Sequence, residues 1–242
     1  MAESDPILTT QPASHRGQRL FPPRSSRLYW VLTRLRCELE SIISQVVGGD
    51  EAIGSGDLVD FGCGNMPYRP LLQPHVGRYL GCDLPGNEAA ELITDVPGTI
   101  PVSDQSVSVV LSNQVLEHVE HPHEYLNEAR RVLLPDGILI LSTHGVWKYH
   151  PDPRDYWRWT CEGLRKQIQD CGFQIIRFRG IMGPRATALQ LLQDQRIPHL
   201  PRAFRSWYSR YMQLKIEIAD RRCSDESRDQ DACVYLVVAK KV

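Results

Sequence analysis

The stretch LVDFGCGN, residues 58–65, decides the fold. A short apolar run of this kind is typical of a buried strand, and Gly62 and Gly64 allow a sharp turn and the close approach of a ligand to the backbone. About twenty residues further on, RYLGCD ends on Asp83, and a carboxylate at the end of a second strand suits the hydroxyls of a ribose. The pair predicts a nucleoside-bearing cofactor at the carboxyl edge of a parallel sheet.

Two departures from the dinucleotide-binding fingerprint indicate which cofactor this is. That fingerprint has a third glycine three residues after Gly64, where this chain has Pro67. Asp60 comes just before the glycine loop, where a carboxylate repels a pyrophosphate but suits a ligand with an ammonium group. These residues resemble the first motif of the class I S-adenosylmethionine-dependent methyltransferases, which is an acid followed by a G-x-G loop. The resemblance favours S-adenosylmethionine over NAD.

Longer segments extend this resemblance over about residues 55–180. PVSDQSVSVVLSNQVLEHVEHPHEYLNEARRVLLPDGILILST, residues 101–143, looks like the family's run from the turn before the fourth strand, through an L-E-H element, to the L-x-P-x-G turn and the fifth strand. CGNMPYRPLL and YHPDPRDYWRWT resemble a bacterial methyltransferase-11-like subgroup, often associated with glycan or secondary-metabolite pathways. His144 departs from the pattern, because many relatives have proline after S-T.

Composition bounds the class of protein. A chain of 242 residues with 42% hydrophobic content suits one α/β domain, and 28 basic against 29 acidic residues provide no overall field that would recruit nucleic acid. We find no apolar run of the roughly 18 residues needed to span a bilayer and no signal-peptide pattern, so we expect a cytoplasmic protein. Seven cysteines without a C-x-x-C pair predict neither a disulfide framework nor a metal site.

The order of elements predicts the architecture. Residues 1–24 are aperiodic and read as a flexible arm, and residues 25–242 as one methyltransferase domain that begins with a helix from Ser26 to the stop at Gly48 and Gly49. Strand-like runs then alternate with helices, which is typical of a parallel sheet with helices on both faces. We therefore expect an α/β, Rossmann-like sheet of seven mostly parallel strands with an antiparallel last strand. The expected strands are residues 57–61, 78–83, 91–95, 106–112, 137–143, 173–180 and 232–242.

An insertion at about residues 182–228 is longer than a simple crossover requires. It predicts two helices that form a cap over the acceptor pocket or the face of a homodimer, although packing into the core accounts for most of its apolar positions. Residues 202–210 are basic and aromatic, so peripheral contact with a membrane is an alternative. The acidic opposite end of the insertion argues against that contact.

Cofactor-binding roles follow from the chemistry of the ligand. The glycine loop would pass beside the methionine moiety, with Asp60 facing its amino group and Asp83 accepting hydrogen bonds from the ribose. By resemblance, Asp95 and Val96 would flank the adenine, although Asp95 before Pro97 also fits a simple turn. The expected set is Asp60, Gly62, Cys63, Gly64, Asp83, Leu84, Asp95, Val96, Asn113 and Gln114, of which the last two would line the sulfonium side.

The candidate catalytic residues are His118, His144 and His150. Methyl transfer from a sulfonium needs mainly positioning, and a general base matters chiefly for a hydroxyl acceptor. All three histidines follow predicted strands at the same edge, and the pKa of histidine lies close to cellular pH. A structural role for His118 at a helix entry is an equal alternative. The nearby His121 and His123 do not complete a metal-ligand spacing.

Aromatic residues gather after the fifth strand, where a loop would cover the methyl group. We expect Trp147, Tyr149, Tyr156 and Arg154 to contact the acceptor, and a tryptophan such as Trp157 to anchor the loop. Pairing of the loop arginines with neighbouring aspartates is the competing expectation.

The sequence thus predicts methyl transfer from S-adenosylmethionine to a small-molecule or sugar acceptor, at a hydroxyl, with S-adenosylhomocysteine as the product. Two alternatives remain open. One is a rearrangement or cyclisation on the same scaffold without methyl transfer, and the other is a non-catalytic, cofactor-binding partner subunit.

Overall fold

Seven strands form one sheet in the order β3-β2-β1-β4-β5-β7-β6 in the computed structural model, which describes residues 19–47, 56–152 and 154–242. All neighbouring strands are parallel except β7, which runs antiparallel to both β5 and β6. The predicted architecture is therefore confirmed. The strands are β1 Leu58–Phe61, β2 Tyr79–Asp83, β3 Leu92–Ile93, β4 Val107–Asn113, β5 Leu133–His144, β6 Phe173–Ile181 and β7 Val234–Lys241.

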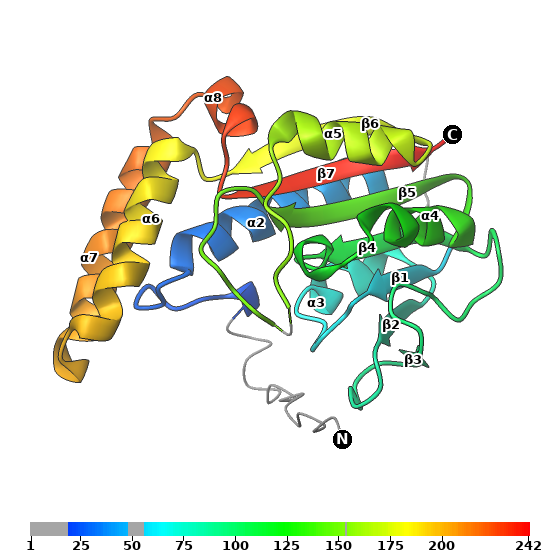
Figure 1. Cartoon of the computed structure of the whole chain (residues 1–242), viewed down its shortest axis with the longest axis horizontal. Coiled ribbons are helices and arrows are strands. Elements are labelled where there is room, and N and C mark those ends of the chain that lie inside the picture. The colour runs from blue at the N-terminus through cyan, green and yellow to red at the C-terminus, as the bar shows by residue number, and fades with distance from the viewer. Residues whose placement is uncertain (1–18, 48–55, 153) are drawn as a thin grey trace, which may run out of the picture.

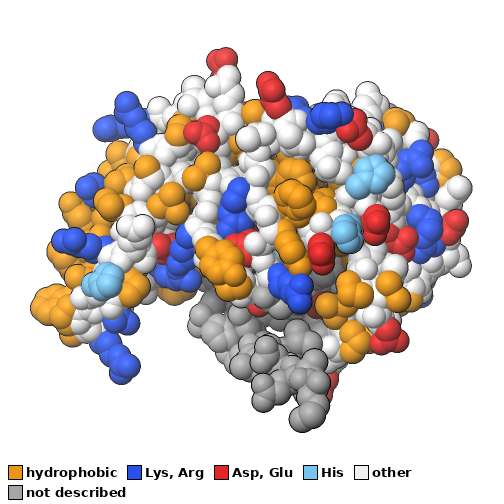
Figure 2. All heavy atoms as spheres, viewed as in Figure 1, with side chains coloured by type: hydrophobic (Ala, Val, Ile, Leu, Met, Phe, Trp, Pro, Cys, Tyr) orange, Lys and Arg blue, Asp and Glu red, His pale blue; other side chains and the backbone are white. Residues whose placement is uncertain are grey.

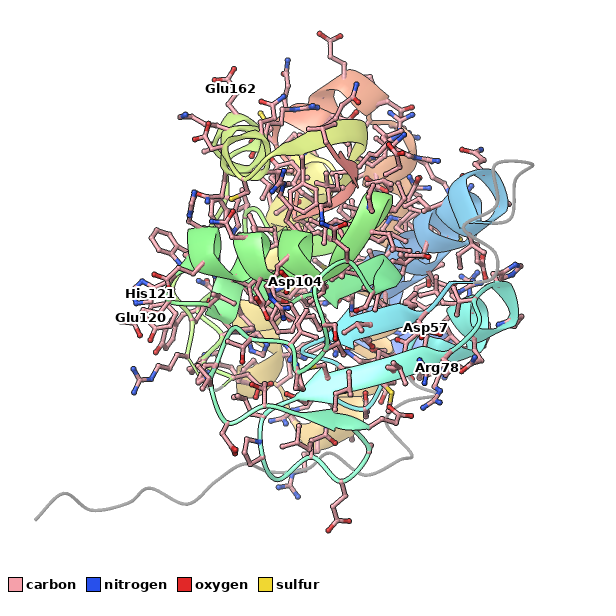
Figure 3. All side chains as sticks on the ribbon, turned by 90° about the vertical axis from the view of Figure 1, so that its right-hand side faces the viewer. Asp57, Arg78, Asp104, Glu120, His121 and Glu162 are labelled. Atoms are coloured by element: carbon pink, nitrogen blue, oxygen red, sulfur yellow. The ribbon has the colours of Figure 1, made fainter. Side chains whose placement is uncertain are left out.

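Helices cover both faces of this sheet, so the central strands are apolar on both sides. One face packs against α2 (Tyr29–Ile42) and the short α3 (Arg69–Leu72), and the other against α4 (Pro122–Val132) and α5 (Cys161–Asp170). Figure 3 shows α4 and α5 on one side of the sheet and α2 on the other. All four residues of β1 are buried between these layers.

Local signals account for where the helices begin and end. The hydroxyl oxygen of Thr160 accepts a hydrogen bond of 3.1 Å from the amide of Gly163 and caps α5. Gly172, with a φ of +75°, follows the end of that helix. A turn of π-helix, Ile43–Val47, continues α2, and the predicted stop at Gly48 and Gly49 lies outside the described residues. So do residues 1–18 of the predicted arm, whereas Leu20 is buried in the core.

The insertion between β6 and β7 contains α6 (Pro184–Arg196), α7 (Arg202–Arg221) and α8 (Asp225–Gln230). In Figure 1, α6 and α7 run side by side beyond the end of the sheet. Helix α7 is fixed to α2 by Trp30, whose backbone amide donates to Oε1 of Gln213 and whose indole donates to Oδ2 of Asp220, both at 2.8 Å. None of the described helices is both long enough and apolar enough to cross a membrane.

The parallel strands β1, β2, β4 and β5 all end at one edge of the sheet, because the carboxyl ends of parallel strands lie on the same side. The loops after these strands begin at residues 62, 84, 114 and 145. The fold thus brings four separate segments of the sequence together.

Candidate active site

A cavity of about 1470 Å³ opens at this edge, and all four loops contribute to its lining. Small-molecule pockets usually enclose roughly 300–1,000 Å³. The cavity therefore has room for a cofactor and an acceptor side by side. No residue of the insertion is among the described residues that line it, so the expected cap over the acceptor is not formed by α6 or α7.

The glycine loop is closely packed at Gly62 and open at Gly64, as expected of a loop that holds a ligand. Gly62 has a φ of +77°, and a Cβ there would lie 2.7 Å from Cγ2 of Val115, so only glycine fits. Gly64 has a φ of +50°, and nothing lies within 4 Å of the place a Cβ would take. Asp83 accepts a hydrogen bond of 2.9 Å from the amide of Gly64. The loop after β1 is thus tied directly to the end of β2.

Asn87 is a second tie that sequence reasoning missed. Its side-chain amide donates hydrogen bonds of 2.7 Å both to the carbonyl of Gly64 and to Oδ2 of Asp83. No pattern in the sequence identifies this contact, because it depends on how the loop after β2 folds back on the glycine loop.

Asp60 lines the cavity although only 4% of its surface is exposed. Its pKa is raised to about 7, chiefly by burial and also by the neighbouring charges of Asp83 and Glu91, while the hydrogen bond from the hydroxyl of Tyr79 opposes the shift. A cation placed beside Asp60 would remove much of this cost. The site therefore fits a ligand that carries an ammonium or sulfonium charge.

Asn65, directly after the glycine loop, also lines the cavity. Its side-chain nitrogen is buried and has no hydrogen-bond partner among the described residues. Buried donors are rarely left unpaired, so this amide fits a ligand acceptor such as a carboxylate. Its place next to the motif was the signal that sequence reasoning passed over. Cys63 and Leu84 line the same end of the cavity.

The adenine side differs from the prediction at one residue. Val96 lines the cavity, but Asp95 is exposed and does not. The hydroxyls of Thr94 and Thr99 both donate to the carbonyl of Val96, which closes a turn and leaves Asp95 on the outer surface. The structure therefore agrees with the turn interpretation of Asp95. Asp95 is not among the residues that line the cavity, where the predicted contact with the adenine would be made.

Asn113 and Gln114 both line the cavity. Ser142 on the neighbouring strand donates to Oδ1 of Asn113 at 2.6 Å, and its carbonyl accepts from the amide of Gln114 at 2.9 Å. Gln114 has a φ of +59°, an uncommon conformation for a residue other than glycine. Strained residues of this kind often occur at functional sites.

The three predicted histidines converge on the cavity. The ring centroids of His118 and His150 are 5.6 Å apart, and those of His144 and His150 are 6.1 Å apart. Nδ1 of His118 is hydrogen-bonded to the carbonyl of Arg154. Because a carbonyl oxygen only accepts, Nδ1 carries a proton, and the neutral form of this ring has its lone pair on Nε2.

His144 forms a buried pair with Glu117. Its Nδ1 lies 3.2 Å from Oε1 of Glu117, and neither atom makes a hydrogen bond to a described residue. Burial lowers the pKa of His144 to about 2, with the charge of Arg158 acting in the same direction, and burial raises the pKa of Glu117. Both groups are thus held toward their neutral forms. Thr143 donates to the other oxygen of Glu117 at 2.9 Å and fixes its orientation.

The aromatic loop after β5 divides between lining and support. Tyr156 and Arg154 line the cavity, but Trp147 and Tyr149 do not, which corrects the prediction for these two residues. Trp147 stacks on the ring of His144 with centroids 5.1 Å apart, and Tyr149 is 75% exposed. The indole of Trp157 donates to the carbonyl of Val119 at 2.7 Å, so it is the expected anchor.

Arg158 holds this loop in place from within. Its guanidinium contacts both carboxylate oxygens of Asp155, at 2.5 and 2.6 Å, and donates to the carbonyls of Trp147 and Lys148. The side chain of Asp155 is 1% exposed. Pairing with a neighbouring aspartate, the competing expectation, therefore describes Arg158.

Acidic side chains dominate the described lining of the cavity. Against Arg19 and Arg154 there are eight acids, and the six other than Asp60 and Glu117, whose pKa values are raised, still give the cavity a negative potential that favours neutral or cationic ligands. Figure 3 shows two of the lining residues, Glu120 and His121, side by side. Among the residues that the structure describes, no group of three or more His, Cys, Asp or Glu side chains could hold a metal ion. The acids are Asp60, Asp83, Glu88, Glu117, Glu120, Glu124, Glu128 and Asp152.

Comparison with known proteins agrees with this site. Residues 59–141 match the methyltransferase domain family Methyltransf_11. The chain is 26% identical over 144 residues to a "Probable S-adenosylmethionine-dependent methyltransferase" of Mycolicibacterium smegmatis, covering 56% of this chain and 53% of that protein. It is 27% identical over 168 residues to the human thiol S-methyltransferase TMT1B, covering 61% and 64%. The chain thus spans between half and two thirds of the length of these relatives.

Solved structures show the same fold. An S-adenosylmethionine-dependent methyltransferase from Mesorhizobium loti superimposes with a TM-score of 0.54 at 16% identity, covering 86% of this chain and 98% of that one. The strand order, the glycine loop and the family match over residues 59–141 agree, and together they support a class I S-adenosylmethionine-dependent methyltransferase. The same findings support S-adenosylmethionine as the cofactor.

Proposed function

We propose that this protein transfers the methyl group of S-adenosylmethionine to a hydroxyl of a small-molecule or sugar acceptor. The observation that carries the proposal is that the glycine loop with Asp83 and the three histidines open to one cavity. The first group suits a nucleoside with an amino acid tail, and the second suits a proton acceptor. Both ends of a methyl-transfer site are thus represented in one space.

At the cofactor end, each residue has a distinct task. The Asp83 carboxylate accepts from the ribose hydroxyls, and Asp60 compensates the charge of the amino group. Asn65 donates its unpaired amide to the carboxylate of the methionine moiety. Gln114 and Asn113, held by Ser142, shape the wall beside the sulfur. S-adenosylmethionine supplies a methyl group already activated by the positive charge on its sulfur.

At the acceptor end, His118 is the residue best placed to take a proton. Its Nδ1–H is occupied by the carbonyl of Arg154, so Nε2 accepts the proton of the hydroxyl as the new C–O bond forms. His144 is too deeply buried and its pKa too low for it to accept a proton near neutral pH. Together with Glu117 it positions the loop, because the carbonyl of Glu117 accepts from the amides of Tyr156 and Trp157.

Positioning and proton transfer contribute on different scales. Well-oriented groups gain about 7–11 kcal/mol from proximity, whereas a general base adds roughly a hundred- to ten-thousandfold in rate. Loss of the base should therefore slow methyl transfer without abolishing it. The acid-rich lining disfavours acceptors that carry a negative charge.

The test is an acceptor panel of matched pairs, in which each hydroxyl compound is accompanied by its amino analogue and its carboxylate analogue. S-adenosylhomocysteine release and the mass of the acceptor are both measured. The proposal expects equimolar S-adenosylhomocysteine and methylated product, with the hydroxyl member preferred and the carboxylate member rejected. An acceptor that is rearranged without release of S-adenosylhomocysteine would identify the cyclising alternative, and cofactor binding without turnover across the panel would identify a partner subunit.

A further inference from the structure

Helix α7 carries a row of large apolar side chains on the outside of the molecule. We call this row the α7 stripe. These residues are between 41% and 66% exposed, which is unusual for a contiguous group on a protein surface. The α7 stripe consists of Phe204, Trp207, Tyr211, Leu214 and Ile218.

The α7 stripe faces away from the body of the protein. Its members are separated by three or four residues, so they lie along one side of the helix. The opposite side of α7 is buried, and Gln213 and Asp220 there hold Trp30 of α2. The rings of Trp207 and Tyr211 are stacked, with centroids 5.9 Å apart and planes within 4°. The stripe is therefore ordered, preformed and separate from the core.

Positive charge borders the α7 stripe. Arg210, Lys215 and Arg221 are exposed, and the ammonium of Lys215 lies 5.4 Å from the centre of the Tyr211 ring. Of the two acids of α7, Glu217 pairs with Arg221 and offsets that charge, and Asp220 is buried against Arg228, so neither is paired with Arg210 or Lys215. Figure 2 shows hydrophobic side chains and Lys or Arg side chains gathered at the end of the molecule formed by α6 and α7.

We propose that the α7 stripe docks on an anionic lipid bilayer, with α7 lying in the plane of the headgroups. Aromatic rings prefer the boundary between headgroups and acyl chains, and basic side chains beside them reach anionic headgroups. A helix of 20 residues extends about 30 Å, so the whole stripe contacts a flat surface at once. This surface is independent of the methyl-transfer proposal, because no residue of the stripe lines the cavity.

The charge pattern favours lipid over a second copy of the chain. In a twofold dimer the same face meets itself, so Arg210 and Lys215 would be brought toward their own counterparts without an exposed acid of α7 to pair with. The chain as a whole has a net charge of -1 and an acidic cavity. The positive surface is thus local to this face, as expected for a part of the molecule that meets anionic headgroups.

The experiment is sedimentation of the full-length protein with vesicles of phosphatidylcholine alone and of phosphatidylcholine with phosphatidylglycerol. The wild-type protein should bind only the anionic vesicles, and binding should weaken as salt rises. The double variant R210E/K215E should lower the partition coefficient at least about tenfold, since each basic residue near an anionic surface contributes roughly fivefold. The double variant F204S/W207S, which removes two apolar aromatic rings from the stripe, should also lower it at least about tenfold. Ile176→Ser, at a 51% exposed apolar residue on β6, is the matched control and should leave binding unchanged.

Circular dichroism and the melting temperature identify a variant that fails to fold, and light scattering without vesicles gives the oligomeric state. Absence of vesicle binding by the folded wild-type protein overturns the proposal, as does binding that both double variants retain. A dimer that F204S/W207S converts to a monomer, with no vesicle binding by the wild type, assigns the α7 stripe to a second copy instead.

Discussion

The hydroxyl of Tyr79 donates a hydrogen bond of 2.5 Å to the buried carboxyl group of Asp60, on the neighbouring strand of the sheet. This hydrogen bond opposes the rise in the pKa of Asp60 that burial causes, but the pKa nevertheless reaches about 7. The protein thus maintains a costly carboxylate at the edge of its cavity. We attribute that cost to the cationic ligand that Asp60 receives.

A first prediction concerns the pH dependence of stability. Because the folded pKa of Asp60, about 7, exceeds its ordinary value of 3.8, Asp60 favours the folded state below about pH 4, and this contribution is lost as pH rises through 7. Asp60→Asn should therefore gain stability relative to the wild type between pH 4 and pH 8, by up to about 4 kcal/mol. Denaturant unfolding of the cofactor-free proteins at several pH values measures this difference.

Asp57 provides a control with the opposite sign. It lies at the start of β1, where the hydrogen bond from Arg78 lowers its pKa, and Figure 3 shows the two side chains together. Asp57→Asn should lose stability relative to the wild type as pH rises through the carboxylate range. The assignment of Asp60 fails if the two variants show the same pH dependence.

A second prediction separates backbone strain from crowding in the glycine loop. Gly62 and Gly98 both have a positive φ, but only at Gly62 would a Cβ meet another side chain, Val115. Gly62→Ala should cost the strain of a left-handed residue plus about 1–3 kcal/mol of overpacking, whereas Gly98→Ala should show the strain alone. Denaturant titration compares them, and equal losses would contradict the close packing of the loop.

A third prediction concerns His118. Removal of a general base should lower kcat about a hundred- to ten-thousandfold while the affinity for cofactor changes little. Steady-state kinetics of His118→Ala with saturating cofactor measure this. His123→Ala is the matched control, because this nearby histidine is exposed and its ring is hydrogen-bonded only to Asn127 among the described residues. If His118→Ala turns over like the control, His118 has only a structural role.

Features that follow from strand geometry could be predicted from the sequence. Asp60, Asp83, Asn113 and His144 each lie at or near the end of a strand, and adjacent parallel strands end at one edge. Their convergence therefore required only the correct order of elements. The alternation of strands with helices was enough for that order, because each strand carries a nearly continuous apolar run.

Features that depend on loop conformation could not be predicted. Tyr149 and Trp147 lie in the same loop as Tyr156, and the pairing of Arg158 with Asp155 fixes the fold of that loop. Of these three aromatic residues, only Tyr156 lines the cavity. Asp95 lies two residues after the end of β3, yet the turn after that strand leaves it outside the cavity lining. The exposed α7 stripe has the same helical spacing as a buried face, so periodicity alone predicts that its residues pack into the core.

The cavity should bind S-adenosylmethionine through the glycine loop and Asp83. Calorimetric titration of the protein with the cofactor tests this binding most directly. The wild-type protein should bind, and Asp83→Ala should weaken binding roughly ten- to a hundredfold, since a hydrogen bond to a charged group contributes about 1.5–3 kcal/mol. Asp95→Ala, at an exposed acid outside the cavity, should bind like the wild type. Equal cofactor affinities of Asp83→Ala and the wild type would show that Asp83 does not hold the cofactor.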